Sequence, residues 1–280
     1  MKQNVLIDEI DGYTQYGVSV IASSGGSYRE LITCPSLKKV PANDWPEEDG
    51  IEVDLSEPVL DTMKCSLRFV CEHGKSGIDA FFDRLNDGAY HVFEFPEIDR
   101  SYKLRVSAQP NLTVSGDYRV FSLQFENDFP LAASYSYSPP QSTYVLPNFG
   151  ILLDGKNIRN YGIGVTGDWR AEIYRAPEVK NNLTQSVDNR HGVVYDDGQV
   201  KYKSKEVRLN MLMAANSIAE FWNNRDAFLY DLVRPNLRNL TAGTEVLKCY
   251  YKSCSTESFY VRTAVFHQFT LSLIFTSYRP

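Results

Sequence analysis

The chain contains few of the residues from which catalytic and metal sites are usually built. Its 280 residues include only four histidines and five cysteines. The histidines show no HxxxH spacing and the cysteines form no paired CxxC motifs, so no metal site is predicted. A Gly-x-Ser-x-Gly elbow is missing, and the glycine-rich stretch 23–27 lacks the lysine and the following helix that a phosphate-binding loop needs. We therefore expect neither an enzyme nor a cofactor.

Long apolar runs and an excess of positive charge are also missing. No window approaches the ~18 apolar residues of a membrane-spanning helix, and residues 1–9 lack the apolar core of a secretory signal, so neither is expected. The formal net charge is −6, whereas dedicated nucleic-acid-binding proteins normally carry a basic patch. Sequence-specific nucleic-acid binding is therefore not predicted. The cysteines are predicted to be buried free thiols, which fits a reducing cytoplasm.

What the sequence does contain is one order of patterns that occurs twice. Five landmarks of the first half return in the second half, in the same order and at offsets of 140 to 148 residues. The pairs are 16–20 and 161–165, 63–69 and 205–211, 78–82 and 218–222, 102–106 and 247–251, and 121–125 and 269–273. The alternation of apolar and polar positions is kept while most identities are lost. A pattern that is kept while identities are lost indicates selection for shape. We therefore expect a structural building block in preference to a catalyst.

The repeat predicts two domains of one fold. The first would occupy residues 1–133 and the second residues 149–280. Between them, residues 134–148 form a Ser-, Tyr- and Pro-rich connector that breaks all periodicity and is expected to be extended. Each domain would open with a strand that ends in Tyr-Gly. A polar stretch with a hairpin turn follows, at 49–50 in the first copy and at 191–192 or 197–198 in the second.

Each copy then continues with a long strand, one helix and closing strands. Strict alternation predicts strands with one buried face. The buried positions would be Met63, Cys65, Leu67, Phe69 and Cys71 in the first copy and Val207, Leu209, Met211 and Met213 in the second. Helical spacing of apolar residues predicts helices over 78–85 and from 218, the latter with Asn216 or Ser217 as N-cap. The predicted fold is mostly β (α+β), with two tandem split β-barrel or sandwich domains, each with one flanking helix.

Charged and aromatic side chains in the predicted loops are the candidate functional residues. The acidic cluster 44–54 does not fit a calcium-binding EF-hand and is interpreted as a solvated hairpin. Large aromatic residues in loops either pack beneath those loops or form contact hot spots, and both alternatives stay open. The candidate interface residues are Trp45, Glu47, Glu48, Asp49, Tyr135, Tyr137, Tyr144 and Trp169.

The order of these elements resembles the N-terminal domain of bacteriophage distal tail (Dit) proteins, and more broadly the tail-tube fold. The residues that carry the resemblance are 16–18, 49–50, 63–71, 78–85 and 102–106, with second-copy matches at 161–163, 191–192, 207–213 and 218–222. The resemblance implies a split β-barrel with a flanking helix, assembled into rings whose loops and hairpins grip neighbouring subunits. A departure is the second copy, because many Dit proteins carry a carbohydrate-binding-like domain in that place.

The resulting hypothesis is a non-enzymatic structural component of a phage or prophage-derived tail, of the distal tail, tube or baseplate-hub type. Its place would be the virion tail, after assembly in the bacterial cytoplasm. Its partners would be further copies of itself, as a trimeric or hexameric ring, and neighbouring tail proteins. Loops 41–58 and 184–203 would make the contacts between subunits. The alternatives are a carbohydrate-binding module that uses Trp45 and Trp169, and a hydrolase that uses acidic residues of 44–54.

Overall fold

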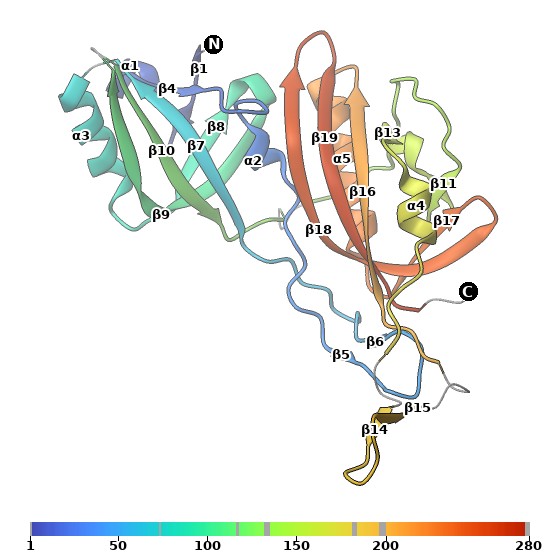
Figure 1. Ribbon diagram of the computed structural model, residues 1–280. Coiled ribbons are helices and arrows are strands. Elements are labelled where there is room, and N and C mark those ends of the chain that lie inside the picture. Colours follow the sequence, from blue (N-terminus) through green and yellow to red (C-terminus); the bar gives the residue numbers. More distant parts are fainter. Residues whose placement is uncertain are drawn as a thin grey trace.

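The computed structural model describes residues 2–72, 74–115, 118–131, 135–180, 184–195 and 200–277. Within them the chain forms two large antiparallel sheets that lie next to each other (Figure 1). The first sheet uses residues 2–127 and the second residues 151–275. The fold is mostly β with curled sheets, as predicted. None of the described helices is long and apolar enough to cross a membrane.

The first sheet has eight strands in the order β1-β4-β7-β10-β9-β8-β2-β3. Their bounds are β1 (Lys2–Gln3), β2 (Leu6–Ile7), β3 (Ile10–Asp11), β4 (Val18–Ile21), β7 (Met63–Cys71), β8 (His91–Phe95), β9 (Arg100–Ser115) and β10 (Tyr118–Asn127). The helices of this half are α1 (Gly12–Tyr16), α2 (Arg29–Ile32), α3 (Gly74–Leu85) and the 3-10 turn η1 (Pro96–Ile98). A separate hairpin joins β5 (Ala42–Asn43) to β6 (Glu52–Val53).

The second sheet has seven strands in the order β12-β11-β17-β18-β19-β16-β13. Their bounds are β11 (Ile151–Leu153), β12 (Lys156–Asn157), β13 (Ile163–Val165), β16 (Lys205–Ala215), β17 (Arg238–Ala242), β18 (Glu245–Val261) and β19 (Val265–Phe275). Its helices are η2 (Ile158–Tyr161), α4 (Trp169–Tyr174) and α5 (Ile218–Leu232), and its separate hairpin joins β14 (Thr184–Ser186) to β15 (Val193–Tyr195).

The two sheets have one strand order, apart from the extra strand β1. Starting from β3, the order β3-β2-β8-β9-β10-β7-β4 corresponds strand by strand to β12-β11-β17-β18-β19-β16-β13. The register agrees as well, because Phe69 pairs with Phe121 in the first sheet and Met211 pairs with Phe269 in the second. These four residues belong to matched landmarks of the sequence repeat. The recurring pattern therefore reflects the same strand pairing made twice.

The predicted buried faces and long helices are confirmed. All nine predicted inward positions of β7 and β16 are buried, and they pack in the apolar core. Helix α3 ends at Leu85, and the positive φ of Gly88 follows it. Helix α5 begins after Ser217, whose side chain accepts a hydrogen bond from the backbone N–H of Glu220 and so caps the helix.

The prediction that a strand ends at each Tyr-Gly is wrong. Tyr16 and Tyr161 instead end the short helical turns α1 and η2, and the strand starts after the glycine. Asp11 and Asn157 cap these turns by accepting hydrogen bonds from nearby backbone N–H groups. Gly17 and Gly162 end the turns with left-handed φ values of 69° and 70°, a conformation that glycine adopts without a Cβ clash. Short helices α2 and α4 also lie in the polar stretches that follow each Tyr-Gly, where no helix was predicted.

Helix α5 holds the two halves together. The Trp222 indole donates a hydrogen bond of 2.6 Å to the backbone oxygen of Ile98, in the other half of the chain. The buried guanidinium of Arg225 donates to the backbone oxygens of Ile32 and Thr33. Asp226 pairs with Arg225 within the helix. It also forms an ion pair of 2.9 Å with Arg100 of the first half, across the contact between the halves, which we name the joint. Charged groups buried in this way fix a single arrangement, because each has partners only in that arrangement.

A segment of the first half, residues 25–37, also runs along the second sheet (Figure 1), and we name it the strap. The backbone N–H of Phe259 donates to the oxygen of Gly25, and the N–H of Leu37 donates to the oxygen of Lys252, both across the joint. β18 pairs with β17 only up to Cys249, so the strap hydrogen-bonds to a stretch of strand beyond that pairing. Gly25 and Gly26 pack so closely on β18 that an added Cβ would lie 2.4 and 2.1 Å from its backbone oxygens.

Substitution of Gly162 by alanine should destabilise the fold more than substitution of Gly155. Both glycines have positive φ, which costs a non-glycine residue roughly 1–3 kcal/mol. At Gly162 an added Cβ would also lie 2.4 Å from the backbone oxygen of Ala214, whereas at Gly155 it would meet nothing within 4 Å. We expect Gly162→Ala to lower the free energy of unfolding by about 2 kcal/mol more than Gly155→Ala, since overpacking adds to strain. Equal shifts in urea denaturation would contradict this.

Candidate assembly surface

Each half extends one β-hairpin beyond its sheet. We name residues 42–53, with β5 and β6, the N-arm, and residues 184–195, with β14 and β15, the C-arm. Both arms lie beyond the second sheet, at the end away from the hairpin between β18 and β19 (Figure 1). The predicted hairpin turns 49–50 and 191–192 lie in the two arms, and the alternative turn 197–198 lies outside the described residues. Four of the candidate interface residues belong to the N-arm.

The N-arm is docked on the second half of its own chain by one buried lysine. Lys180 has a side chain that is only 6% exposed. Its ammonium group donates hydrogen bonds of 2.8 Å to the backbone oxygens of Trp45 and Gly50, and it pairs with Asp44 at 2.5 Å. Hydrogen bonds from a charged donor are stronger than those between neutral groups. Lys180 therefore fixes the N-arm at its base.

Gly50 is the point of closest approach between the N-arm and the second sheet. Its N–H donates to the oxygen of Tyr202, and the N–H of Ile51 donates to the oxygen of Thr276, just beyond the end of β19. The N–H of Tyr202 in turn donates to the Asp49 carboxylate. A Cβ on Gly50 would lie 1.7 Å from the oxygen of Thr276, so only glycine permits this contact.

A groove of about 540 Å³ lies between the N-arm and the second half. The N-arm contributes Trp45, Glu48 and residues 49–53 to its lining, and the second half contributes Leu237, Lys248, Thr276 and Ser277. Trp45 is 50% exposed, and its indole N–H donates to Glu52 at 3.3 Å. Glu47 and Glu48 are exposed, and Asp49 is exposed although its carboxylate accepts from Tyr202. This end of the N-arm presents an aromatic ring among carboxylates to solvent.

The connector tyrosines pack on their own chain, along α5 and β19. The Tyr137 hydroxyl donates to Asp231 at 2.9 Å, and its ring lies 5.0 Å from that of Tyr230. Tyr135 also packs against Tyr230, and Tyr144 lies edge-on to Phe266. All three are half-buried, so they combine packing with a partly accessible edge. The first residue of the predicted connector, 134, lies outside the described residues, and residues 135–148 form no helix or strand.

Asp231 anchors the connector through a buried charge cluster. Burial raises the pKa of its carboxyl, but hydrogen bonds from Lys156, Tyr161 and Tyr137 lower it further than burial raises it. The net pKa is below the usual value, so the carboxylate stays ionised and accepts from all three donors. This arrangement holds Tyr137 against α5, and it supplies a fixed charge where the connector enters the second half.

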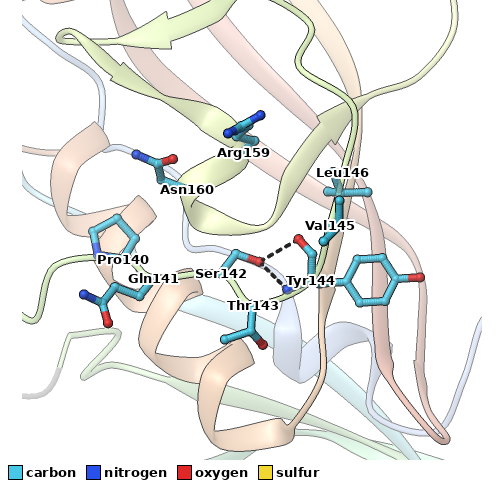
Figure 2. Close-up of a pocket in the computed structure, with 9 residues that line it drawn as sticks. All are labelled: Pro140, Gln141, Ser142, Thr143, Tyr144, Val145, Leu146, Arg159 and Asn160. Atoms are coloured by element: carbon cyan, nitrogen blue, oxygen red, sulfur yellow. Dashed lines mark hydrogen bonds between the residues drawn. The ribbon is translucent and has the colours of Figure 1, made fainter.

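A second groove, of about 410 Å³, lies where the connector passes η2 (Figure 2). Its lining comes from residues 140–146 together with Arg159 and Asn160. The Ser142 hydroxyl lies within hydrogen-bond distance of both the N–H and the oxygen of Tyr144, and it stabilises the bend of the connector there (Figure 2). Val145 points its apolar side chain into solvent. Seven of the eight candidate residues thus fall into two separate groups, one on the N-arm and one on the connector.

Trp169 packs beneath its loop, which is one of the two alternatives predicted for the loop aromatic residues. It is the first residue of α4 and is only 6% exposed, so its ring packs in the core beneath the loop. The helix forms because Asp168 accepts a hydrogen bond from the backbone N–H of Ala171. A buried indole offers little area to a partner, which leaves Trp45 as the accessible tryptophan of the pair.

The residues that dock the N-arm were missed by sequence reasoning. Lys180 stands in a polar stretch with no periodic pattern, and Gly50 was assigned only to a hairpin turn. No metal-ligand cluster of histidine, cysteine and acidic residues occurs within the described ranges. All five cysteines are free and buried, as predicted.

Comparisons with known proteins identify no family. No protein-family profile matches the chain, and no curated protein sequence matches it significantly. A solved structure to which it is similar is that of the Dit protein of phage SPP1, described as a paradigm of the hub adsorption apparatus in phages that infect Gram-positive bacteria. The TM-score is 0.33 at 14% identity, over 45% of this chain and 49% of that chain. A likeness at this level identifies neither the family nor the function of the chain.

Loss of the Lys180 ammonium should release the N-arm without unfolding the sheets. Hydrogen bonds to charged groups contribute about 1.5–3 kcal/mol, so Lys180→Ala should lower local stability of the N-arm by about 2 kcal/mol. Hydrogen exchange of residues 44–53 should accelerate, while exchange in β16 and β19 stays unchanged. The matched control is Lys203→Ala, because Lys203 makes only an exposed ion pair with Glu178. The same exchange rates in both variants would show that Lys180 does not hold the arm.

Proposed function

We propose that the chain is a non-enzymatic structural subunit that assembles by self-association into a ring, as a component of a phage tail or a related injection apparatus. The observation that supports this most is the docking of an arm from one copy of the fold on the next copy of the same fold. Such a contact uses two different surfaces of one framework, and contacts of this heterologous kind can be repeated until a ring closes.

The tandem arrangement supports the same proposal. We propose that residues 1–133 and 149–280 are two domains of one fold, with the connector 134–148 between them. Three chains would then place six domains in one layer, and six chains would make two layers. The joint at α5 and the strap keep the two halves in one orientation, which a subunit of a regular assembly needs. The resemblance of the sequence pattern to Dit and tail-tube domains supports the proposal that such a ring belongs to the tail, as a distal tail, tube or hub component.

The accessible candidate residues are the proposed contact sites with neighbours. Trp45, Glu47, Glu48 and Asp49 stand at the exposed end of the N-arm, and Tyr135, Tyr137 and Tyr144 line the connector. Aromatic residues are enriched where interfaces are most tightly bound, because they bury large areas with few rotatable bonds. Neighbouring tail proteins are the proposed partners for these sites.

The first prediction from this proposal concerns mass. The purified chain should shift from monomer to a trimer or hexamer as its concentration rises, and electron microscopy of the oligomer should show closed rings. Light scattering or native mass spectrometry across a concentration series checks the mass. A chain that stays monomeric up to millimolar concentration, with and without neighbouring tail proteins, would contradict self-assembly.

A second candidate function, glycan binding, is favoured by one observation. Trp45 exposes half of its ring beside a groove that carries several carboxylates, and aromatic faces with nearby acceptors suit sugar rings. If this function holds, the wild-type chain should bind in a glycan array, and Trp45→Ala should reduce that binding at least tenfold. Trp169→Ala is unsuitable as a test because its indole is buried. Tyr13→Ala, which removes an exposed aromatic ring of the first half, serves as the control.

A further inference from the structure

We infer that the C-arm of one chain docks on the first half of a neighbouring chain. The site it would occupy corresponds to the site that receives the N-arm within each chain. The inference rests on the proposed self-assembly and adds the surfaces that would meet. It follows from the repeat, since the chain contains two arms and two docking sites, one of each in either half. Only one of the two docking sites is filled within a single copy.

The two arms are equivalent residue by residue. The N-arm pairs Ala42 with Val53, and the C-arm pairs Thr184 with Tyr195, so both ends of the hairpin are shifted by 142 residues. The same shift relates Gly50, whose φ is 73°, to Gly192, whose φ is 80°. Ile51 then corresponds to Val193. Both arms thus carry the glycine that, in the N-arm, makes the closest contact.

The base of the docking site also exists twice. Val179 forms a β-bridge with Tyr202, and 142 residues earlier Leu37 forms one with Leu60. The backbone bond from Lys180 to residue 201 is matched by one from Lys38 to residue 59. Lys38 is therefore the counterpart of Lys180, the lysine that holds the N-arm. Lys180 is buried beneath that arm, whereas Lys38 is exposed.

The rim of the docking site exists twice as well. In the second half it consists of Leu237, Lys248, Thr276 and Ser277, which line the groove under the N-arm. By the matching strand register, their counterparts in the first half are Tyr90, just before β8, Lys103 in β9, and Asp128 and Phe129, just after β10. These four side chains form one cluster in the first half. The Tyr90 and Phe129 rings are 5.3 Å apart, the Lys103 ammonium lies over both, and the Tyr90 hydroxyl donates to Asp128.

The second pair of surfaces is exposed where the first pair is covered. Gly50 is buried, whereas a Cβ added at Gly192 would meet no described atom within 4 Å. Val193 is 59% exposed, and Phe129 is 51% exposed. Exposed apolar groups on both an arm and its corresponding site indicate surfaces that are covered on association.

The occupant of the site on the first half is a second copy. The C-arm lies beyond the second sheet, apart from β8 and β10 of its own chain (Figure 1). Within one chain, the second half sits against the first half in a fixed way. If the first half of a neighbouring chain sat against this second half in the same way, its Lys38 and Phe129 would reach the C-arm. Gly192 would then lie on the Asp128 backbone of that chain, and the N–H of Val193 would donate to its oxygen, as Ile51 does to Thr276. Halves would alternate around the ring.

The first test compares two neighbouring lysines. Lys38→Ala removes the ammonium that would hold the incoming C-arm, and it should raise the concentration for half-assembly at least tenfold. Lys39→Ala, also exposed and one residue away, should leave that concentration unchanged within twofold. Thermal unfolding of both monomers should match wild type. Equal assembly of Lys38→Ala and wild type would overturn the inference, because the ammonium would then hold no arm.

The second test is a cross-link between chains. Chains with Val193→Cys are mixed with chains with Phe129→Cys and oxidised at assembling concentration. We expect covalent dimers from the mixture and none from either chain alone, and a ladder from the double variant. Ile51→Cys with Ser277→Cys is the positive control within one chain, since Gly50 lies against Ser277. Rings that form without the cross-link would overturn the inference and leave the proposed function standing. A chain that stays monomeric would overturn the proposed function itself.

Discussion

The guanidinium of Arg225 is the group on which the shape of the whole chain depends. It is buried between the halves, and it donates to the backbone oxygens of Ile32, the last residue of α2, and of Thr33, which follows it. Taking a charge out of water is costly, so this joint is stable only because Asp226 and those oxygens replace the lost solvent. Arg100 and the Trp222 indole complete the contact, with the Arg100 guanidinium 4.4 Å from the ring centre. Any rotation of one half against the other would leave buried charges without partners.

The fixed orientation of the halves is what brings the N-arm to its site. With the joint in place, the strap follows the edge of β18, and the chain then reaches Lys180 and the end of β19. The strap has a second effect, because it covers backbone groups that an unpaired strand would otherwise offer to other proteins. Packing, edge protection and arm position are thus consequences of one arrangement. The proposed ring extends that arrangement from halves within a chain to halves of different chains.

The sequence predicted the features that depend on local periodicity and missed those that depend on contact between the halves. Alternation in β7 and β16 identified the buried faces, and helical spacing identified α3 and α5. Trp222 belongs to the same apolar stripe as Phe221, yet its indole reaches the other half. Lys180 and Gly50 act through backbone oxygens far away in the chain, and no spacing records such partners. The eight candidate residues were chosen for residue type in loops, and burial decided among them, with Trp169 buried and Trp45 exposed.

The equal strand order of the halves, combined with their unlike outer residues, has a consequence for symmetry. Scaffolds that share this strand order carry different side chains on their outer surfaces, because the repeat kept the strand pairing and the core while the surface residues diverged. A partner protein that contacts only the shared strand framework would bind each half in the same way. A partner protein that contacts the side chains would distinguish the two halves, so it would find one site per chain in place of two. In the proposed ring, such a polypeptide would present one rotational order to a partner that contacts the shared scaffold and half that order to a partner that contacts the side chains.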